Sequence, residues 1–315
     1  MRVRQAFAFA VLGFCVIFGV LSNHAAESRG GDWTIRKSEV AGKVEFAIIE
    51  HRHGGTSDHS SDWPSSYFVG VDFFKAGRQD VRFTIARDAG KIECEGFLNN
   101  GEGAGIFHFQ PDPNYAREMH TLGFSIDNDE DKQFSMAVMD VSLDFARQMK
   151  NEHLDRMDAD KLIAFRIFGV TAEFIEQLRG EGLKISDSDK LVAFRIHGVT
   201  PEMVRALRKD GYSPDEDKLV AMRIHGATPE WIADLKKLGY DRVDLDQLIA
   251  FRIHGVSPEF IAKLQGLGYA HPDPDELVAM RIHGVTPDYI AAMKGRGMQN
   301  LSIDQLVNMR IHGID

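Results

Sequence analysis

A four-residue motif, Arg-Ile-His-Gly, recurs through the second half of the chain and constrains the fold more than any other feature. It begins at Arg195, Arg223, Arg252, Arg281 and Arg310, and a variant with Phe in place of His begins at Arg166. Successive copies are 28 or 29 residues apart. Such a period is typical of proteins in which one small unit is copied and each copy buries its apolar surface against its neighbours.

Each copy predicts two short helices. The first is expected to begin at the Asp of an Asp-x-Leu segment, whose carboxylate can cap the opening turn, and to end at the motif glycine. The second begins at Thr or Ser, usually followed by Pro, and ends at another glycine. Helices of about nine residues are marginal alone. Because Leu191, Phe194 and Ile196 cover more than one face, we expect them to be buried by the adjacent copies.

The array extends upstream of the first clear motif. Residues 131–149 match residues 160–178, with Asp140 in place of the motif glycine. The segment from Asp112 to Tyr115 matches the start of a second helix without a preceding first helix. The structural unit is therefore predicted to be a hairpin in which the Pro-started helix precedes the Asp-started helix. About seven such hairpins fit into residues 111–315 and form an α-solenoid.

Residues 31–110 differ in pattern from the repeats. Apolar and polar residues alternate at 44–48, 83–85 and 92–94, as in half-buried strands. Turn sequences at 88–90 and 99–101 separate strands that would form hairpins. We expect an antiparallel β-domain of five or six strands, which makes the chain an α+β protein. The polar stretch from His53 to Ser66 is expected to be a long loop.

The first 26 residues indicate export. Arg2 and Arg4 precede a 16-residue uncharged apolar run, which is typical of a secretory signal peptide. We expect a periplasmic or extracellular protein; the alternative is an uncleaved segment that anchors it to the inner membrane, its only membrane contact. The formal net charge of −10 argues against nucleic acid as a partner. After cleavage Cys94 is the single cysteine, so an internal disulfide is excluded.

Three columns of repeated side chains are candidates for binding or packing. The arginine column, from Arg166 to Arg310, either pairs with the Asp or first-turn Glu column or binds carboxylates along the array. The aromatic column, which includes Trp231 and Tyr289, either belongs to the core or binds a peptide. The histidine column is expected to pack at helix ends, because copies about 10 Å apart cannot share one metal ion.

No catalytic motif is present, so we predict neither an enzyme nor a cofactor nor a bound metal. One further cluster stays open: His51, His53 and His59 lie with Asp58 around the expected β-domain loop. We interpret it as a solvated polar loop. The alternative is a metal site, because His51 and His53 would project to the same side of a continued strand.

The segments LVAMRIHGVTPDYI (residues 277–290) and LIAFRIHGVSPEFI (residues 248–261) resemble tandem repeats of exported proteins of soil bacteria. They are also similar to repeat regions appended to some membrane metallopeptidases of the β-lactam-sensor family. The resemblance covers residues 111–315 and, more loosely, the β-domain. It implies an extracytoplasmic sensing or interaction region. The zinc motif of those peptidases is absent from this sequence, so no catalytic residue carries over.

These observations predict a noncatalytic exported scaffold or sensor-like module that binds a protein or peptide along the solenoid. The candidate binding residues are Arg166, Arg195, Arg223, Arg252, Arg281, Arg310, Trp231 and Tyr289. One alternative is a cell-envelope structural protein that self-associates through its C-terminal repeat, where Leu306, Met309 and Ile311 keep the internal apolar pattern. Another is a metal-dependent hydrolase that uses the β-domain loop histidines.

Overall fold

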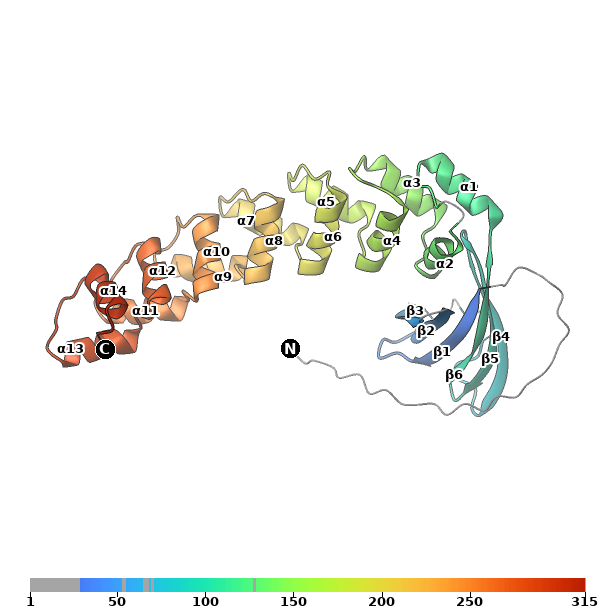
Figure 1. Cartoon of the computed structure of the whole chain (residues 1–315), viewed down its shortest axis with the longest axis horizontal. Helices are drawn as coiled ribbons and strands as arrows, with labels where there is room; N and C mark the ends of the chain where they lie inside the picture. Colours follow the sequence, from blue (N-terminus) through green and yellow to red (C-terminus); the bar gives the residue numbers. More distant parts are fainter. Residues whose placement is uncertain (1–28, 53–54, 65–67, 69–70, 127–128, 315) are drawn as a thin grey trace. The chain divides into compact units, whose positions relative to one another are not determined.

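A computed structural model describes residues 29–52, 55–64, 68, 71–126 and 129–314 of the chain. Within these residues six strands are followed by fourteen helices, which confirms the α+β class (Figure 1). The chain divides into two compact units. The first holds the strands up to Ile85 and from Ile92 to Gln110; the second holds the turn Ala86–Lys91 and the helices from Pro111 onwards. The predicted signal segment, residues 1–26, lies outside the described residues.

The first unit is one antiparallel sheet in the order β3-β2-β1-β6-β5-β4. Its strands are β1 Gly30–Lys37, β2 Lys43–Arg52, β3 Gly55–Pro64, β4 Arg78–Arg87, β5 Gly90–Asn99 and β6 Glu102–Pro111. The predicted alternation is confirmed: Val44, Phe46 and Ile48 are buried. The predicted turn between β5 and β6 is confirmed as well. Asn100 and Gly101 both have positive φ, 52° and 85°, as a tight two-residue hairpin turn requires.

The sheet curls over its own apolar face. Phe46 in β2 and Phe83 in β4 are separated by three strands in the sheet order, yet their ring centroids are 6.2 Å apart. Trp33 in β1 is 5.2 Å from Phe83 and fully buried. Gly105 in β6 lies opposite Trp33, and a Cβ at Gly105 would come within 2.7 Å of the indole ring. The glycine therefore makes room for the largest side chain of this core.

The prediction of a long loop from His53 to Ser66 was wrong. Residues 55–64 form β3, which pairs with β2 so that His59 lies opposite Ile48. A polar segment forms a strand here because β3 is at the edge of the sheet, where its backbone pairs with β2 and no burial of its side chains is required.

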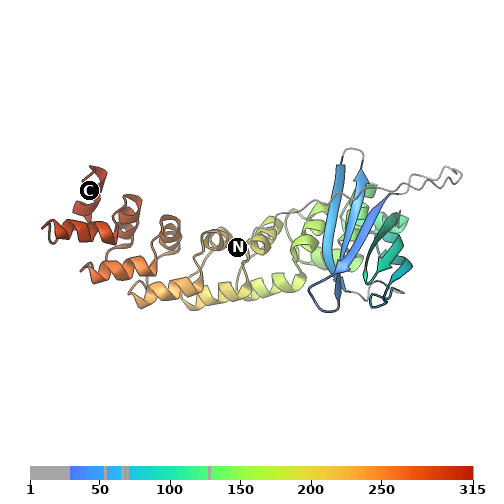
Figure 2. The same ribbon diagram turned by 90° about the horizontal axis from the view of Figure 1, so that it is seen from below.

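The second unit consists of seven helical hairpins, as the repeat pattern predicted. The helices are α1 Pro113–Leu122, α2 Glu130–Val138, α3 Leu143–Asn151, α4 Ala159–Phe168, α5 Ala172–Gly180, α6 Ser188–His197, α7 Pro201–Lys209, α8 Glu216–His225, α9 Pro229–Lys237, α10 Leu245–His254, α11 Pro258–Gly266, α12 Pro274–Ile282, α13 Pro287–Gly295 and α14 Ile303–Ile311. Even-numbered helices contact one another in sequence, and so do several odd-numbered ones. The hairpins therefore stack in two rows of helices (Figure 2). Among the described residues, none of the helices has both the length and the apolar character that a membrane span needs.

The helix ends follow the expected cap chemistry with one correction. Thr200 caps α7 by accepting a hydrogen bond from the amide of Met203 at 3.3 Å, as predicted. The predicted start at the Asp of Asp-x-Leu was two residues late in every even-numbered helix from α4 to α14. In α6 the cap is Asp187, and Asp189 lies in the first turn. Both positions are acidic, so composition alone did not distinguish them. In the degenerate copy, Asp140 takes the left-handed conformation of the missing glycine, with φ of 54°.

Candidate functional site

The C-terminal ends of the even-numbered helices from α4 to α14 carry the repeated motif. Arg, Ile and His, or Phe in α4, close each helix, with the His of α12 and α14 as the C-cap, and a glycine with φ between 70° and 76° follows. Consecutive helical residues point about 100° apart, so the Ile side chain projects between those of Arg and His. We call these side chains the RIH row; its residues are 166–168, 195–197, 223–225, 252–254, 281–283 and 310–312.

The arginines of the row join neighbouring hairpins. Nε of Arg195 donates to the backbone carbonyl of Phe168, the last residue of α4, at 3.0 Å. The same bond links Arg223 to His197 at 3.0 Å, Arg252 to His225 at 3.0 Å and Arg281 to His254 at 3.2 Å. The last carbonyls of a helix have no donor within that helix, and the arginine of the next hairpin supplies one. The row is therefore continuous from hairpin to hairpin.

The motif glycine has two reasons to be glycine. Gly198 has φ of 72°, a conformation that side-chain-bearing residues rarely adopt. A Cβ at this position would also lie 2.8 Å from Nη2 of Arg223. The arginine of one hairpin and the glycine of the preceding one thus form a single contact, which explains why both recur at the same period.

The aromatic column lies beneath the arginines. The guanidinium carbon of Arg195 is 4.8 Å from the centre of the Phe174 ring. Equivalent stacks join Arg166 to Phe145 at 5.3 Å, Arg252 to Trp231 at 5.2 Å, Arg281 to Phe260 at 5.1 Å and Arg310 to Tyr289 at 4.8 Å. Tyr289 is buried and its hydroxyl donates to the carbonyl of Ile314 at 2.8 Å. Trp231 is half-buried. Each ring is therefore part of the packing that holds an arginine in place.

The predicted acidic partners were wrong for four arginines of the column. Arg166 lies 3.1 Å from Asp140, whereas Arg195, Arg223, Arg252 and Arg281 donate to helix carbonyls. The pKa of the first-turn acid Glu230 is lowered by hydrogen bonds from its own backbone amide and Thr228, and by the charge of Arg223. Hydrogen bonds from the Glu202 backbone amide and the Thr200 hydroxyl lower the pKa of Glu202. Across the described residues, Arg195, Arg223, Arg252 and Arg281 have no carboxylate within 4.0 Å.

The isoleucines of the row are exposed, contrary to the expectation for Ile196. Its side chain is 54% exposed, and the five equivalent isoleucines are between 53% and 56% exposed. Leu191 and Phe194 of the same helix are fully buried. The even-numbered helices from α4 to α12 each contact the two flanking even-numbered helices, and the isoleucine lies on a side that these contacts leave exposed. Val192 and Ala193, one turn earlier, are half-buried and extend this apolar strip.

The histidines also differ from the expectation of packed side chains. His225, His254, His283 and His312 are exposed, and His197 is half-buried. They do lie at helix C-terminal ends, as predicted. Each belongs to a separate hairpin, and the structure brings no group of three potential metal ligands together in the residues that it describes.

A second set of repeated charges, at the N-terminal ends of the same helices, was missed. Lys132 pairs with Asp160 at 3.1 Å, and the equivalent pairs are Lys161–Asp189, Lys190–Asp217 and Lys218–Asp246. The hydrogen bond and charge of Lys161 lower the pKa of Asp189. The sequence signal was the repeated Asp-Lys dipeptide. These acids are neutralised by lysines of the preceding hairpin, so they do not balance the charge of the arginines.

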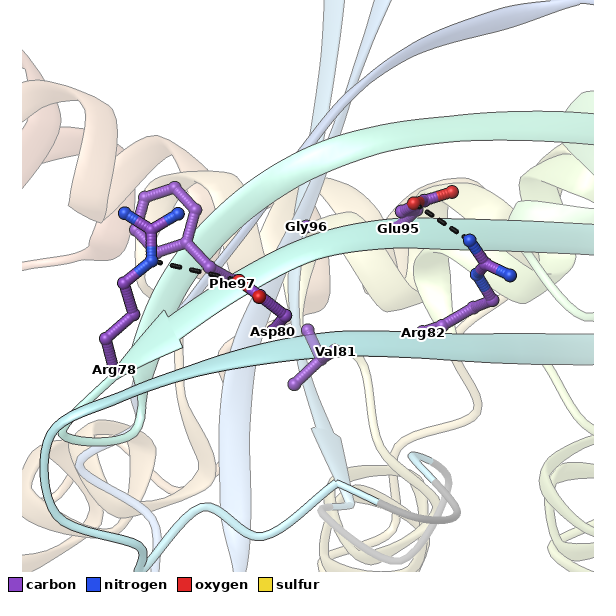
Figure 3. A pocket seen from close by; sticks show the side chains of 7 residues that line it. All are labelled: Arg78, Asp80, Val81, Arg82, Glu95, Gly96 and Phe97. Atoms are coloured by element: carbon purple, nitrogen blue, oxygen red, sulfur yellow. Dashed lines mark ion pairs between the residues drawn. The ribbon is translucent and has the colours of Figure 1, made fainter.

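The β-domain has a shallow depression of about 410 Å³ on β4 and β5 (Figure 3). It is lined by Arg78, Asp80, Val81, Arg82, Glu95, Gly96 and Phe97. Arg82 pairs with Glu95 at 2.9 Å, and the Arg78 guanidinium lies 4.4 Å from the centre of the Phe97 ring. Its arginines thus already have partners within the strands, which makes the depression a weaker binding candidate than the RIH row.

The β-domain histidines cannot be assembled into a site. His53 lies outside the described residues, and of His51, Asp58 and His59 only the backbone is described. The metal site at this place stays a prediction. Cys94, the other reactive side chain of the domain, is buried in β5, and burial raises the pKa of its thiol far above the usual range. A thiol in that state is a poor nucleophile.

Comparison with protein-family models and with curated protein sequences gives no match to this chain.

Proposed function

We propose that this protein is a noncatalytic, exported binding scaffold that docks a protein or peptide segment along the RIH row. The observation that carries the proposal is the regular exposure of six isoleucines, each more than half exposed, at the same position of six consecutive hairpins. Single exposed apolar residues are normal on protein surfaces. A regular series of them, extended in α6, α8 and α12 by a half-buried Val and Ala one turn earlier, is typical of an interaction surface.

The arrangement of the arginines supports the same surface. Their Nε atoms and aromatic stacks hold them against the array, so their guanidinium groups are already ordered before any partner arrives. Preordered side chains lose little conformational entropy on binding. The aromatic column, which includes Trp231 and Tyr289, contributes through this support of the arginines.

The test is selection of peptides from a random display library on the purified protein, followed by affinity measurement on a variant of the row. We expect Ile196→Asn, Ile224→Asn and Ile253→Asn together to weaken binding of the selected peptides at least tenfold, roughly 1.4 kcal/mol or more. The control is Ile106→Asn, because Ile106 in β6 is also about half exposed, at 51%, but does not belong to the row.

Equal binding to both variants would place the docking surface elsewhere and refute the proposal. Sedimentation velocity on the same proteins tests the alternative of a self-associating envelope protein. Self-association that the triple variant abolishes would show that the row joins copies of this chain, and would replace the scaffold by that structural function.

Export is proposed from residues 1–26 alone. Fusion of these residues to alkaline phosphatase, which is active only outside the bacterial cytoplasm, tests it. We expect activity with the segment and loss of activity without it. Equal activity of the two fusions would contradict export through this segment.

A further inference from the structure

We infer that the partner of the RIH row is an extended acidic peptide with an apolar side chain at every third residue. This inference rests on the proposed function, because it names the class of segment that the same surface takes. Three features of the row lead to it: the spacing of the isoleucines, the charge beside them and the hydrogen-bond donors that remain available.

The first feature is the spacing. The even-numbered helices contact one another directly, α4 with α6, α6 with α8 and onwards to α14. Directly packed helices lie roughly 8–10 Å apart, so the isoleucine column repeats at about that distance. A polyproline II chain has three residues per turn and a rise of about 3.1 Å, which returns the same face every 9.3 Å or so. Each turn of such a peptide therefore matches one hairpin.

A β-strand does not match in this way. Three residues of a strand span about 10 Å, but its side chains alternate between two faces, so every third residue points away from the surface. An α-helix with a seven-residue repeat would advance about 10.5 Å and does match the spacing. The choice between the two matching conformations depends on the other two features.

The second feature is charge. Arg195, Arg223, Arg252 and Arg281 each use Nε for a carbonyl bond, and none has a carboxylate within 4.0 Å among the described residues. At the other end of α6, α8 and α10, Asp189, Asp217 and Asp246 each pair with a lysine of the preceding hairpin. From α6 to α12 the row therefore presents, beside each exposed isoleucine, an arginine that has no direct ion pair among the described residues. An acidic side chain at every third residue of the peptide would lie near each of these arginines and could pair with it.

The third feature is the supply of donors. A guanidinium has five N–H groups, and the carbonyl bond of each arginine uses the one on Nε. The terminal nitrogens of Arg195, Arg223, Arg252 and Arg281 are left as donors, whereas Arg166 uses one of its own for Asp140. A helix bonds its own carbonyls internally, whereas a polyproline II chain leaves all of them without an internal partner. One cluster of donors for every three residues therefore suits the extended chain better than the helix.

The probe is a fluorescein-labelled peptide of about five Pro-Val-Glu triplets, long enough to cover five hairpins. Three peptides of the same length are matched controls: Pro-Val-Lys triplets, a shuffled sequence of the same composition without the period of three, and a helical peptide with valine and glutamate at a seven-residue period. Fluorescence anisotropy at low and high salt gives the dissociation constants for the full chain.

We expect the Pro-Val-Glu peptide to bind more tightly than each control by at least about tenfold, with affinity that falls as salt screens the arginines. The charge is varied on the peptide because replacing the arginines would also remove helix caps. Isoleucine methyl signals in the NMR spectrum report the place of binding. Those of Ile196, Ile224, Ile253 and Ile282 should shift on titration, and that of Ile106 should not.

Three outcomes would overturn the inference. Equal affinity for the Pro-Val-Lys or shuffled peptide removes charge or period as the basis of recognition. Tighter binding of the helical peptide replaces the extended partner by a helical one. If none of these peptides binds but library-selected peptides of another pattern still depend on Ile196, Ile224 and Ile253, this inference fails while the proposed function stands. If the selected peptides ignore the isoleucines as well, both fail.

Discussion

At the scale of single residues, the motif glycine and the arginine of the next hairpin act together. Gly198 and Gly211 both have positive φ, 72° and 89°. A Cβ at Gly198 would meet Arg223, whereas one at Gly211 would meet nothing within 4 Å. Alanine substitutions at these two glycines therefore distinguish the energetic cost of backbone strain from the cost of losing the arginine contact.

We expect Gly211→Ala to lower the free energy of unfolding by about 1–2 kcal/mol through the left-handed conformation alone. Gly198→Ala should cost roughly 1 kcal/mol more, because it also displaces Arg223 from the carbonyl of His197. Urea denaturation followed by circular dichroism measures both. Gly180→Ala is the control: Gly180 ends α5 at negative φ with free space around it, so alanine should leave stability unchanged or raise it. Equal costs at Gly198 and Gly211 would show that the arginine contact adds nothing.

The stack between Arg252 and Trp231 gives a second prediction at this scale. A double-mutant cycle with Arg252→Met and Trp231→Leu should yield a coupling of about 0.5–1 kcal/mol in unfolding free energy. The matched cycle uses Arg223→Met and Met203→Leu, where the same column position holds a thioether side chain. We expect a smaller coupling there. Couplings of the same size in the two cycles would assign the stabilisation to packing and not to the aromatic face.

At the scale of elements, lysine–aspartate pairs join successive even-numbered helices. Lys161 of α4 lowers the pKa of Asp189 in the first turn of α6. Because the folded-state pKa lies below the ordinary value, the pair stabilises the fold above the ordinary pKa of Asp. This contribution is lost as the pH falls through the folded-state value.

Replacing Lys161 by Met should therefore raise the pKa of Asp189 towards its usual range, as followed by NMR of the carboxyl carbon during a pH titration. High salt should also raise the pKa of Asp189 in the unmodified protein, because the pair is exposed to solvent and salt screens it. The pKa of Glu202 serves as control, since hydrogen bonds from its own backbone amide and the Thr200 hydroxyl lower it and no lysine takes part. An Asp189 pKa that does not respond to Lys161 would contradict the pairing.

At the scale of the whole molecule, the turn between β4 and β5 belongs to the helical unit although its strands belong to the β-domain. Arg87 pairs with Asp140 at 3.2 Å, and the amide of Leu143 donates to the Asp88 carboxylate at 2.9 Å. Gln133 donates to the carbonyl of Ala89 at 2.7 Å. Within the helical unit this turn is thus held by contacts to α2, α3 and the residue Asp140 between them.

Cys94, buried in β5, reports on opening of the hairpin that this turn closes. Its raised pKa and burial predict that a thiol reagent such as dithionitrobenzoate does not label the native protein. We expect labelling to begin at lower urea concentration when Asp88→Ala removes the bond to Leu143. The Asp72→Ala variant is the control, because its local carboxylate contact is to Phe74, in an exposed segment. Rapid labelling without denaturant would contradict the burial of Cys94.

How far the fold could be predicted differs between elements. The ends of the motif helices, the Thr or Ser caps of the following helices and the hairpins between strands were predicted because caps, left-handed glycines and two-residue turns act within a few residues along the chain. The edge strand β3 was not, since its sequence is polar and only its partner β2 makes it a strand. At the candidate site, the motif predicted which residues recur but not which side of the helix faces solvent.

The period, the pair of helices in each copy and the places where those helices end follow from contacts between residues close in the chain, so they can be predicted from the amino-acid sequence. The bond from Arg195 to the carbonyl of Phe168, 27 residues away, and the exposure of Ile196 depend on how the hairpins pack. A periodic pattern repeats every contact equally, so it cannot show which repeated apolar residue is covered by the neighbouring copy and which is left in water.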